Sequence, residues 1–456
     1  MTERAPVIQV PEGGFVKDAV RDWPRLPELY HRHGPVFKVV DAGVPYVFAF
    51  SPDATRQVVT RPDLLHTTLE ETVSRRAPED SALRRLGSGI HWVNGARHRE
   101  QRQLFVPGYH RRQVAAYADI VVRQTERMLA RWRVGDERNL YMEMSRLALA
   151  FDVEITFGVD SPDDPPPFVP LLLRYSQEIF DVPSDVEFGI RDVPPSLLEL
   201  AEELEGAVLE HLARVRAGAA PGHGYSMLVQ AADETGVMGD RELVGNALSL
   251  FLAGHDSVAS ALASALVLLA LHPRVAADLA DELHGVLGGA PPRVEELDRL
   301  PLLNGVVLET LRLFPPGPWA KRVAVAPAEV GPFAVAEGGL VIYSAYVTHR
   351  IPELYPEPQR FRPERWRGAS PAPYAFIPFG AGQRQCIGHA LALMELRLVL
   401  ATVLQRHRLS LSPGTVINRG MAAGARRELT MRVYAQDRRF AADPVEGNIR
   451  QMVDLD

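Results

Sequence analysis

One stretch limits the possible folds more than any other: PFGAGQRQCIGHALALMELRLVLA, residues 378–401. It contains Cys386, the only cysteine among the 456 residues. Gly380, Gly382 and Gly388 lie around the cysteine, and glycine allows tight turns and close approach of the backbone to a flat ligand. The run HALALMELRLVLA that follows has the apolar spacing of an amphipathic helix. The stretch therefore predicts a tight loop that presents a thiol at the start of a helix.

Cys386 has three candidate roles. A lone free cysteine is by default a buried structural thiol. A nucleophilic thiolate would need a histidine base, and His389, three residues into the helix, would lie along the helix flank. The third role is an axial thiolate on haem iron. The glycines favour this third role, as do the positive end of the helix and Arg384, a fixed charge placed to pair with a haem propionate.

The rest of the chain is patterned mainly for helices. Apolar residues recur at helical spacing over 114–132, 142–157, 197–215, 241–271, 275–287 and 302–314. Short strand-like runs predict small sheets, and PVFKVV with YVFAF predicts a hairpin. No stretch has the composition and length of a flexible linker between domains. We therefore expect one mainly α-helical domain with small β-sheets over residues 1–436, followed by a polar surface tail over 437–456.

Composition limits the setting of the protein. Hydrophobic residues make up 46% and charged residues 23%, which is ordinary for a globular protein with a sizeable core. A net charge of −7 gives no reason to expect nucleic acid or an anionic membrane as a partner. The N-terminus lacks the apolar run of a signal peptide, and the single cysteine excludes an internal disulfide. We expect a cytoplasmic monomer with no nucleic-acid and no membrane partner.

The cysteine loop also carries a family resemblance. The string FGAGQRQCIG, from Phe379 to Gly388, resembles the haem-binding signature of the cytochrome P450 superfamily at its fixed phenylalanine, glycine, arginine, cysteine and glycine. The resemblance implies the cytochrome P450 fold and haem b (iron protoporphyrin IX) as cofactor. It implies that Cys386 is the ligand of the iron and that Phe379, Arg384 and Gly388 help to bind the haem. Further landmarks of the family follow one another in order between Pro35 and about Tyr434.

One of these landmarks is a Glu-x-x-Arg pair with a third, arginine partner. Several pairs in the sequence have this spacing, and most of them suit solvated helix faces. Glu309 and Arg312 differ because they lie in an apolar helix, LLNGVVLETLRLFPP, where charges are costly unless paired. In FRPERW, Arg365 takes the place of the family arginine that completes the cluster, and Trp366 stands where phenylalanine is common. We assign this cluster to scaffolding and not to chemistry.

Residues 253–257, AGHDS, resemble the oxygen-binding groove of the family. The resemblance places Ala253 and Gly254 in the groove and gives Asp256 and Ser257 the relay of protons. Glycine inside a helix costs about 1 kcal/mol relative to alanine, and close helix packing is the alternative reason for Gly254. Threonine is usual where Ser257 stands. Serine keeps the hydroxyl but lacks the methyl group that restricts its rotamer, so we expect looser proton delivery.

Cationic side chains are implied at the haem propionates. The segment GARHREQRQLF resembles the haem-contacting helix of the family, which gives this role to His98 and Arg102. The two are four residues apart and share one helix face. Arg322, in WAKRVAVA, matches a further propionate arginine of bacterial members. For Arg97, Arg99 and Arg111 we prefer an ordinary surface charge.

The resemblance implies a haem-thiolate monooxygenase. Such an enzyme inserts one atom of O2 into a C–H or double bond of a hydrophobic small molecule, here of bacterial secondary metabolism (terpenoid or polyketide), with fatty acids also open. The sequence shows no flavin or iron–sulfur segment, so electrons would come from a ferredoxin and its reductase. Arg99, Arg111 and Arg112 are expected to attract an acidic ferredoxin. Phe180, Trp319 and Met421 would line the substrate pocket, with ordinary core as the alternative.

Three other functions remain open. The first is a peroxide-driven oxygenase, against which the Asp256–Ser257 pair argues. The second is a non-catalytic haem-binding sensor or sequestering protein, in which a proton relay would have no purpose. The third is a helical protein with a structural thiol and no haem.

Overall fold

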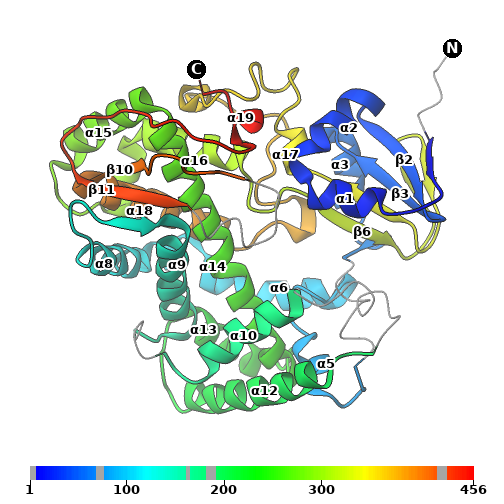
Figure 1. Ribbon diagram of the computed structural model, residues 1–456. Coiled ribbons are helices and arrows are strands. Elements are labelled where there is room, and N and C mark those ends of the chain that lie inside the picture. Colours follow the sequence, from blue (N-terminus) through cyan, green and yellow to red (C-terminus); the bar gives the residue numbers. More distant parts are fainter. Residues whose placement is uncertain (1–6, 68–76, 161–164, 181–191, 419–428, 456) are drawn as a thin grey trace. The chain divides into compact units, whose positions relative to one another are not determined.

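The computed structural model describes residues 7–67, 77–160, 165–180, 192–418 and 429–455, and the chain is mainly helical with small sheets, as expected (Figure 1). Most predicted helices are present close to their expected bounds. They are α9 (Leu140–Phe157), α12 (Pro195–Arg216), α14 (Asp240–Leu271), α15 (Pro273–Leu287) and α16 (Pro301–Leu313). The expected hairpin is formed by β2 (Val36–Asp41) and β3 (Val44–Ala49), which pair antiparallel.

The prediction of one helix over 114–132 is wrong. This stretch contains parts of α7 (Arg111–Ala116) and α8 (Ala118–Leu129), which are separated at Tyr117. The Tyr117 N–H bonds to the Val114 carbonyl only three residues back, at 3.1 Å, so the last turn tightens and the helix ends. Helical periodicity on both sides of the break conceals it in the sequence.

The described chain divides into two compact units. Unit 1 comprises Met1–Leu65, Val121–Leu147 and Ser257–Asp456, and unit 2 comprises His66–Ile120 and Ala148–Asp256. The chain therefore passes between the units four times, and neither unit is a continuous piece of sequence.

Unit 1 contains a mixed sheet with the strand order β1-β2-β3-β9-β6-β4. The remaining strands are β1 (Val7–Val10), β9 (Leu340–Tyr343), β6 (Ala320–Ala324) and β4 (Leu65–His66). Successive side chains point to opposite faces, so Val47 and Phe48 of β3 enter different core clusters. The Val47 cluster includes α3 (Pro52–Val59), and the Phe48 cluster includes residues of α1 (Phe15–Arg21) and α2 (Leu26–His33).

Unit 1 also holds two smaller sheets and the helices around the cysteine loop. β10 (His407–Leu411), β11 (Thr430–Ala435) and β5 (Glu137–Asn139) form one sheet, and β7 (Ala328–Val330) and β8 (Phe333–Val335) form the other. α17 (Ala345–Thr348) and α18 (His389–Arg406) contact α16.

The segment after residue 436 differs from the expected surface tail. Ile449 and Met452 of α19 (Ile449–Met452) are buried, and so is Val453. The guanidinium of buried Arg350 donates to the Met452 carbonyl at 3.3 Å, and the Asp454 N–H donates to the Gln359 carbonyl. These few apolar side chains, set in a polar stretch, are enough to fix the segment to the body of unit 1.

Unit 2 is mainly helical. α12 packs against α10 (Phe168–Phe180), α13 (Gly224–Thr235) and α5 (Ala82–Leu86), and α13 packs against α6 (Gly95–Tyr109). Its core includes an aromatic cluster in which His211 contacts Phe157, Phe168 and Tyr225. Burial lowers the pKa of His211 to about 4, so this histidine is a neutral core residue.

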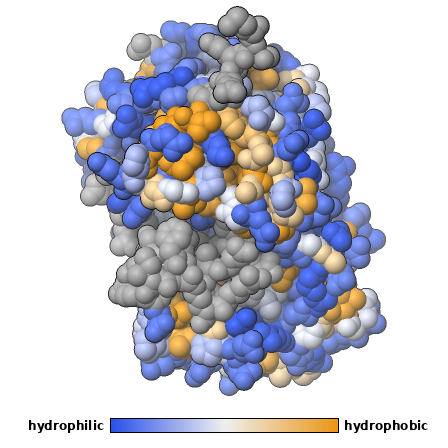
Figure 2. Space-filling model, turned by 90° about the vertical axis from the view of Figure 1, so that its right-hand side faces the viewer, coloured by the Kyte–Doolittle hydropathy of each residue, from blue (hydrophilic) through white to orange (hydrophobic). Residues whose placement is uncertain are grey.

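The longest apolar helix of the described residues is mostly buried, and the surface in Figure 2 is mainly hydrophilic. Figure 2 shows a face that is mainly hydrophilic, with apolar residues gathered in one region of it. Among the described residues, α14 has the length and apolar composition of a membrane span, but 67% of its apolar window is buried inside the protein. Buried core helices of this kind commonly show the same composition.

Candidate active site

The backbone of the cysteine loop is fixed by its own hydrogen bonds in unit 1. The Cys386 N–H donates to the Phe379 carbonyl at 2.9 Å, and a short 3-10 turn runs from Gly382 to Arg384. Gly380 and Gly382 have φ of +67° and +69°, a conformation that favours glycine. A Cβ at position 382 would also overlap the carbonyl oxygen of Val59 in α3. Both glycines are therefore required by the shape of the loop.

The loop ends with an accessible thiol. Cys386 is exposed, and Gly388 is the N-cap of α18. The buried structural thiol is therefore wrong as the role of Cys386. His389 directs Nδ1 to the Cys386 carbonyl oxygen at 3.2 Å, so this ring nitrogen is engaged by the backbone. Among the described residues no group of three or more His, Cys, Asp or Glu side chains could hold a metal ion.

The Glu309 cluster forms as expected in unit 1. Arg312 donates to both carboxylate oxygens of Glu309 at 2.8 Å, and both side chains are fully buried. Arg365 donates to Glu309 Oε1 at 3.2 Å, and the Trp366 indole donates to Oε2 at 2.8 Å. Burial alone would raise the pKa of Glu309, but the hydrogen bonds and charges of Arg312 and Arg365 bring it below its ordinary value. Glu309 is therefore a stable buried carboxylate.

His349 connects this cluster to the cysteine loop and was missed in the sequence. Its Nε2 accepts a hydrogen bond from the Ile377 N–H at 2.8 Å, so Nδ1 carries the proton. Nδ1 lies 3.2 Å from the Arg312 carbonyl oxygen and donates to it. Burial, followed by the charge of Arg312, lowers the pKa of His349 to about 3. The neutral ring thus joins the end of α16 to the segment that leads into the loop.

Two other predicted residues of unit 1 lie at its sheets. Arg322, on β6, donates to the Tyr343 hydroxyl at 3.0 Å and is half-buried. Trp319 packs against the Phe48 cluster, which favours the core alternative for this side chain. Met421 and the side chain of Phe180, both expected at the substrate pocket, lie outside the described residues.

The predicted propionate contacts of unit 2 lie on α6. His98 is buried and Arg102, one turn later, is half-buried. Arg99, Arg111 and Arg112 are exposed, as expected for surface charges. Arg97 differs from that expectation because it forms an ion pair with Glu242 in the first turn of α14.

A buried polar network holds α6 against α14 and was not foreseen. The Gln101 amide donates to the Ser88 carbonyl at 3.0 Å, and Gln101 Oε1 accepts from Asn246 of α14 at 3.3 Å. Asn246 Oδ1 accepts from the Ile90 N–H at 2.8 Å. Gln101 and Asn246 are fully buried, so the network fixes the position of the helix that carries His98 and Arg102.

The predicted proton-relay residues lie on successive turns of α14. Ala253 and Asp256 are exposed, and Ser257 is half-buried. Residues 253, 256 and 257 lie on one face of the helix because they are three and four positions apart. His255 directs Nδ1 to the Phe251 carbonyl at 3.1 Å, and burial lowers its pKa. Gly254 lies against Asp152 of α9, a contact that no sequence motif indicated.

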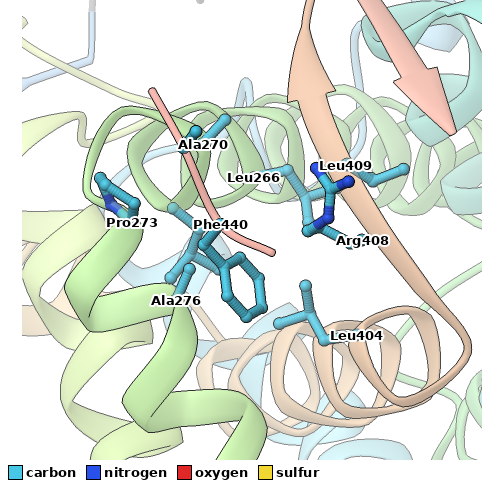
Figure 3. A pocket seen from close by; sticks show the side chains of 10 residues that line it. Leu266, Ala270, Pro273, Ala276, Leu404, Arg408, Leu409 and Phe440 are labelled. Carbon is cyan, nitrogen blue, oxygen red and sulfur yellow. The ribbon is translucent and has the colours of Figure 1, made fainter. Parts of the chain in front are cut away.

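Unit 1 also has a small apolar hollow that is separate from the cysteine loop (Figure 3). Leu404, near the end of α18, and Phe440 lie on its wall. Leu404 is 15 positions after His389, so about 23 Å of helix separates it from the start of α18. Because of this distance we do not assign the hollow to the chemistry of Cys386.

The cysteine loop fits the haem-thiolate role expected for it. Its sulfur is exposed while its backbone is already hydrogen-bonded, and the glycine at 382 lets the loop seat directly on α3. Cys386 lies two residues before Gly388, the N-cap of α18. A soft thiolate close to a helix N-terminus is a ligand that haem iron accepts, and the helix end favours its ionised form.

Comparisons with known proteins agree with this assignment. The family model for Cytochrome P450 matches residues 23–424. Cyclooctat-9-en-7-ol 5-monooxygenase of Streptomyces melanosporofaciens is 31% identical over 84% of this chain and 84% of its own length. Cyclooctatin synthase of the same organism is 31% identical over 73% of this chain and 75% of its own. The solved structure of retinoic acid-bound cyanobacterial CYP120A1 has a TM-score of 0.78 at 22% identity, covering 94% of this chain and 99% of that one.

Proposed function

The chain belongs to the cytochrome P450 family and is a haem b-dependent monooxygenase, and from this premise we propose that it inserts one atom of O2 into an apolar small molecule of the terpenoid or polyketide class. Two relatives support a terpenoid first, because their names describe enzymes of cyclooctatin chemistry. The observation that carries the proposal is the exposed Cys386 thiol, fixed by its loop at the start of α18.

The proposed site residues have separate roles in binding haem. Cys386 would hold the haem iron, and the N-terminus of α18 would stabilise its thiolate. Arg384 and Arg322 would pair with the haem propionates, and the same role is proposed for His98 and Arg102 of α6. Phe379 and Gly388 belong to the same loop and would help to hold the haem. When bound, haem supplies the chemistry that activates dioxygen and oxidises the substrate.

Proton delivery is assigned to α14. Asp256 is exposed, so its carboxyl group exchanges protons with solvent. Ser257 follows it on the same turn and is half-buried, so its hydroxyl can carry a proton from Asp256 into the interior. Gly254 and Ala253 keep this turn free of bulky side chains.

A spectroscopic experiment tests the ligand. Holoprotein produced with ample haem is reduced under carbon monoxide, and we expect the difference spectrum of a thiolate-ligated haem. Cys386→Ser should lose that spectrum and the oxidation activity, whereas Gln383→Ala, at an exposed position of the same loop, should keep both. Colourless protein, or a Cys386→Ser variant with an unaltered spectrum and unaltered oxidation, contradicts the proposal.

A ligand screen tests the substrate class. Cyclic terpenoid alcohols, macrolide-type polyketides and fatty acids are titrated into the ferric protein, and the shift of the haem absorption is recorded. We expect terpenoids to give the tightest saturable shift. Turnover is then measured with a ferredoxin and its reductase and, separately, with peroxide alone. Equal product from peroxide alone would favour the peroxide-driven oxygenase.

We further propose that a ferredoxin docks on exposed arginines of unit 2, Arg99, Arg111 and Arg112. The double variant Arg111→Glu/Arg112→Glu should slow reduction by ferredoxin at low salt without changing the substrate Kd. The control Arg146→Glu/Arg274→Glu changes the net charge equally at exposed arginines outside this group. An unchanged reduction rate in the first variant counts against the docking site.

The domain bounds, the cellular location and the oligomeric state of the protein are also proposed. We place the catalytic domain at residues 1–436 and treat 437–456 as an extension packed onto it, in a cytoplasmic monomer without nucleic-acid or membrane partners. Cell fractionation and light scattering of the purified protein test the location and the monomeric state.

A further inference from the structure

Gly254 of α14 is required by a contact with α9. A Cβ built at position 254 would overlap Oδ1 and Cγ of Asp152 and lie 2.8 Å from Oδ2. The φ of Gly254 is not in the left-handed region, so the backbone itself would accept an alanine. The carboxyl group of Asp152 therefore occupies the place that a side chain on α14 would take. Both residues belong to unit 2.

The environment of Asp152 is unusual for a carboxyl group. Its side chain is buried, with 8% of the residue exposed, and Oδ2 has no hydrogen-bonding partner among the described residues. Oδ1 accepts one hydrogen bond, from the Thr156 hydroxyl at 3.3 Å. Burial raises the pKa of Asp152 well above its ordinary value. Burial therefore favours the protonated form of this carboxyl group.

The contact lies at the turn that carries the predicted proton relay. Ser257 is three positions after Gly254 and lies along the same flank of α14. A threonine would restrict its own rotamer through its methyl group, but Ser257 cannot. Packing by neighbouring residues can restrict this turn instead, and Asp152 is a polar neighbour whose carboxyl group lies directly against Gly254.

We propose that Asp152 is a positioning residue for proton delivery. Its carboxyl group fills the space beside the Cα of Gly254, here called the notch, and so holds residues 253–257 of α14 in the geometry that the proton relay needs. The inference rests on the proposed roles of Asp256 and Ser257. Asp152 touches neither substrate nor cofactor in this scheme. It acts through the helix backbone.

The first test compares an isosteric and a truncated variant of the holoenzyme. Asp152→Asn keeps the size and the hydrogen-bonding capacity, so product formed per reductant consumed should stay within about twofold of wild type. Asp152→Ala should lower that ratio by about fivefold or more and release peroxide instead. Ile155→Ala is the control, because it truncates another buried side chain of α9, and it should lower stability without changing the ratio. An Asp152→Ala enzyme as well coupled as wild type overturns the proposal.

The second test uses the steric complementarity of the pair. The methyl group of Gly254→Ala should clash with the Asp152 carboxyl group and lower the melting temperature. It should also reduce the amount of product formed per reductant consumed, here called the product ratio. In Gly254→Ala/Asp152→Ala the clash is gone, so the melting temperature should recover while the product ratio stays low. Additive effects on the melting temperature would show that the carboxyl group does not occupy the notch, and would overturn the proposal.

Two further readouts do not depend on turnover. The infrared spectrum should contain the C=O band of a protonated carboxylic acid that is lost in Asp152→Asn. Amide hydrogen exchange in residues 253–257 of the holoprotein should be about tenfold faster in Asp152→Ala than in Asp152→Asn. Equal exchange in all variants overturns the positioning role.

Reference variants separate this inference from the proposed function. If Ser257→Ala and Asp256→Asn lower the product ratio but Asp152→Ala does not, the positioning role fails and the relay stands. If Ser257→Ala and Asp256→Asn both form as much product per reductant consumed as wild type, the proposed proton relay itself is wrong.

Discussion

Two buried carboxyl groups of this protein lie in opposite environments. Glu309 of unit 1 accepts hydrogen bonds from Arg312, Arg365, Trp366 and the Arg362 N–H, and its pKa falls below the ordinary value despite burial. Asp152 of unit 2 accepts one hydrogen bond from Thr156, and burial raises its pKa. Burial alone therefore does not decide the charge of a carboxyl group. The number and charge of its donors decide it.

The difference separates two uses of buried polarity. The Glu309 cluster is a charged joint that ties α16 to the segment before the cysteine loop, and His349 extends it to Ile377. The Asp152 contact joins α9 to α14 through a carboxyl group whose neutral form is favoured by burial, so we treat it as a neutral joint. A charged joint fails when one partner is removed, whereas a neutral joint tolerates a neutral isostere.

The largest effect is expected for Glu309→Gln. This change leaves the fully buried Arg312 guanidinium without a counter-charge, so we expect a loss of about 3–5 kcal/mol of unfolding free energy, together with reduced haem content. Urea unfolding and the absorption of the holoprotein measure both. Glu309→Gln as stable as wild type would show that the charge of the cluster is dispensable.

Removing one donor from each carboxyl group sharpens the comparison. Trp366→Phe removes a hydrogen bond to a carboxylate and should cost about 1.5–3 kcal/mol. Thr156→Val removes a hydrogen bond to a neutral acid and should cost about 0.5–1.5 kcal/mol. Urea unfolding at pH 7 checks the order of the two values. The reverse order would contradict the assigned charge states.

The pH dependence of stability should have opposite signs at the two sites. The raised pKa of Asp152 favours folding when the group is protonated, so this contribution is full below the ordinary pKa of 3.8 and is lost as pH rises through the folded-state pKa. Between the ordinary pKa and the folded-state pKa of Asp152, the unfolding free energy of Asp152→Asn should therefore rise relative to wild type by about 1.4 kcal/mol per pH unit.

Glu309 behaves in the other direction. Its lowered pKa gives stability that is full above the ordinary value of 4.5 and is lost as pH falls through the folded-state pKa, so the deficit of Glu309→Gln should shrink in acid. Unfolding by urea in a series of buffers measures both variants. If the unfolding free energies of the two variants, each relative to wild type, changed with pH in the same direction, the contrast between the two sites would be wrong.

The smallest effect is expected at an ion pair whose arginine is exposed to solvent. Arg293 and Glu296 lie 3.5 Å apart, and the Arg293 side chain is 75% exposed. Arg293→Ala should change the unfolding free energy by about 0.5 kcal/mol or less, because water and salt screen such pairs. Urea unfolding at two salt concentrations checks this. A loss comparable to that of Glu309→Gln would show that burial is not the reason for the large contribution of the Glu309 cluster to the unfolding free energy.

Parts of this protein could be predicted because the information is local. The glycines and the helix around Cys386 lie within 24 residues, so their spacing alone indicates the loop. Long apolar periodicity gave α9, α12, α14, α15 and α16. The break at Tyr117 and the packed segment after residue 436 escaped prediction, because a tightened turn leaves the periodicity intact and a few buried apolar residues do not stand out in a polar stretch.

By itself, the sequence determined the type of fold, the place of the thiol and the pairing of Glu309 with Arg312, because each depends on residues a few positions apart or on an extended pattern. The tertiary structure alone decided that Gln101 meets Asn246 and that Asp152 fills the notch at Gly254, over separations of 145 and 102 residues. The physical reason is that a buried polar group takes its charge and its role from the partners that folding brings to it, and contacts between distant segments leave no periodic trace in the chain.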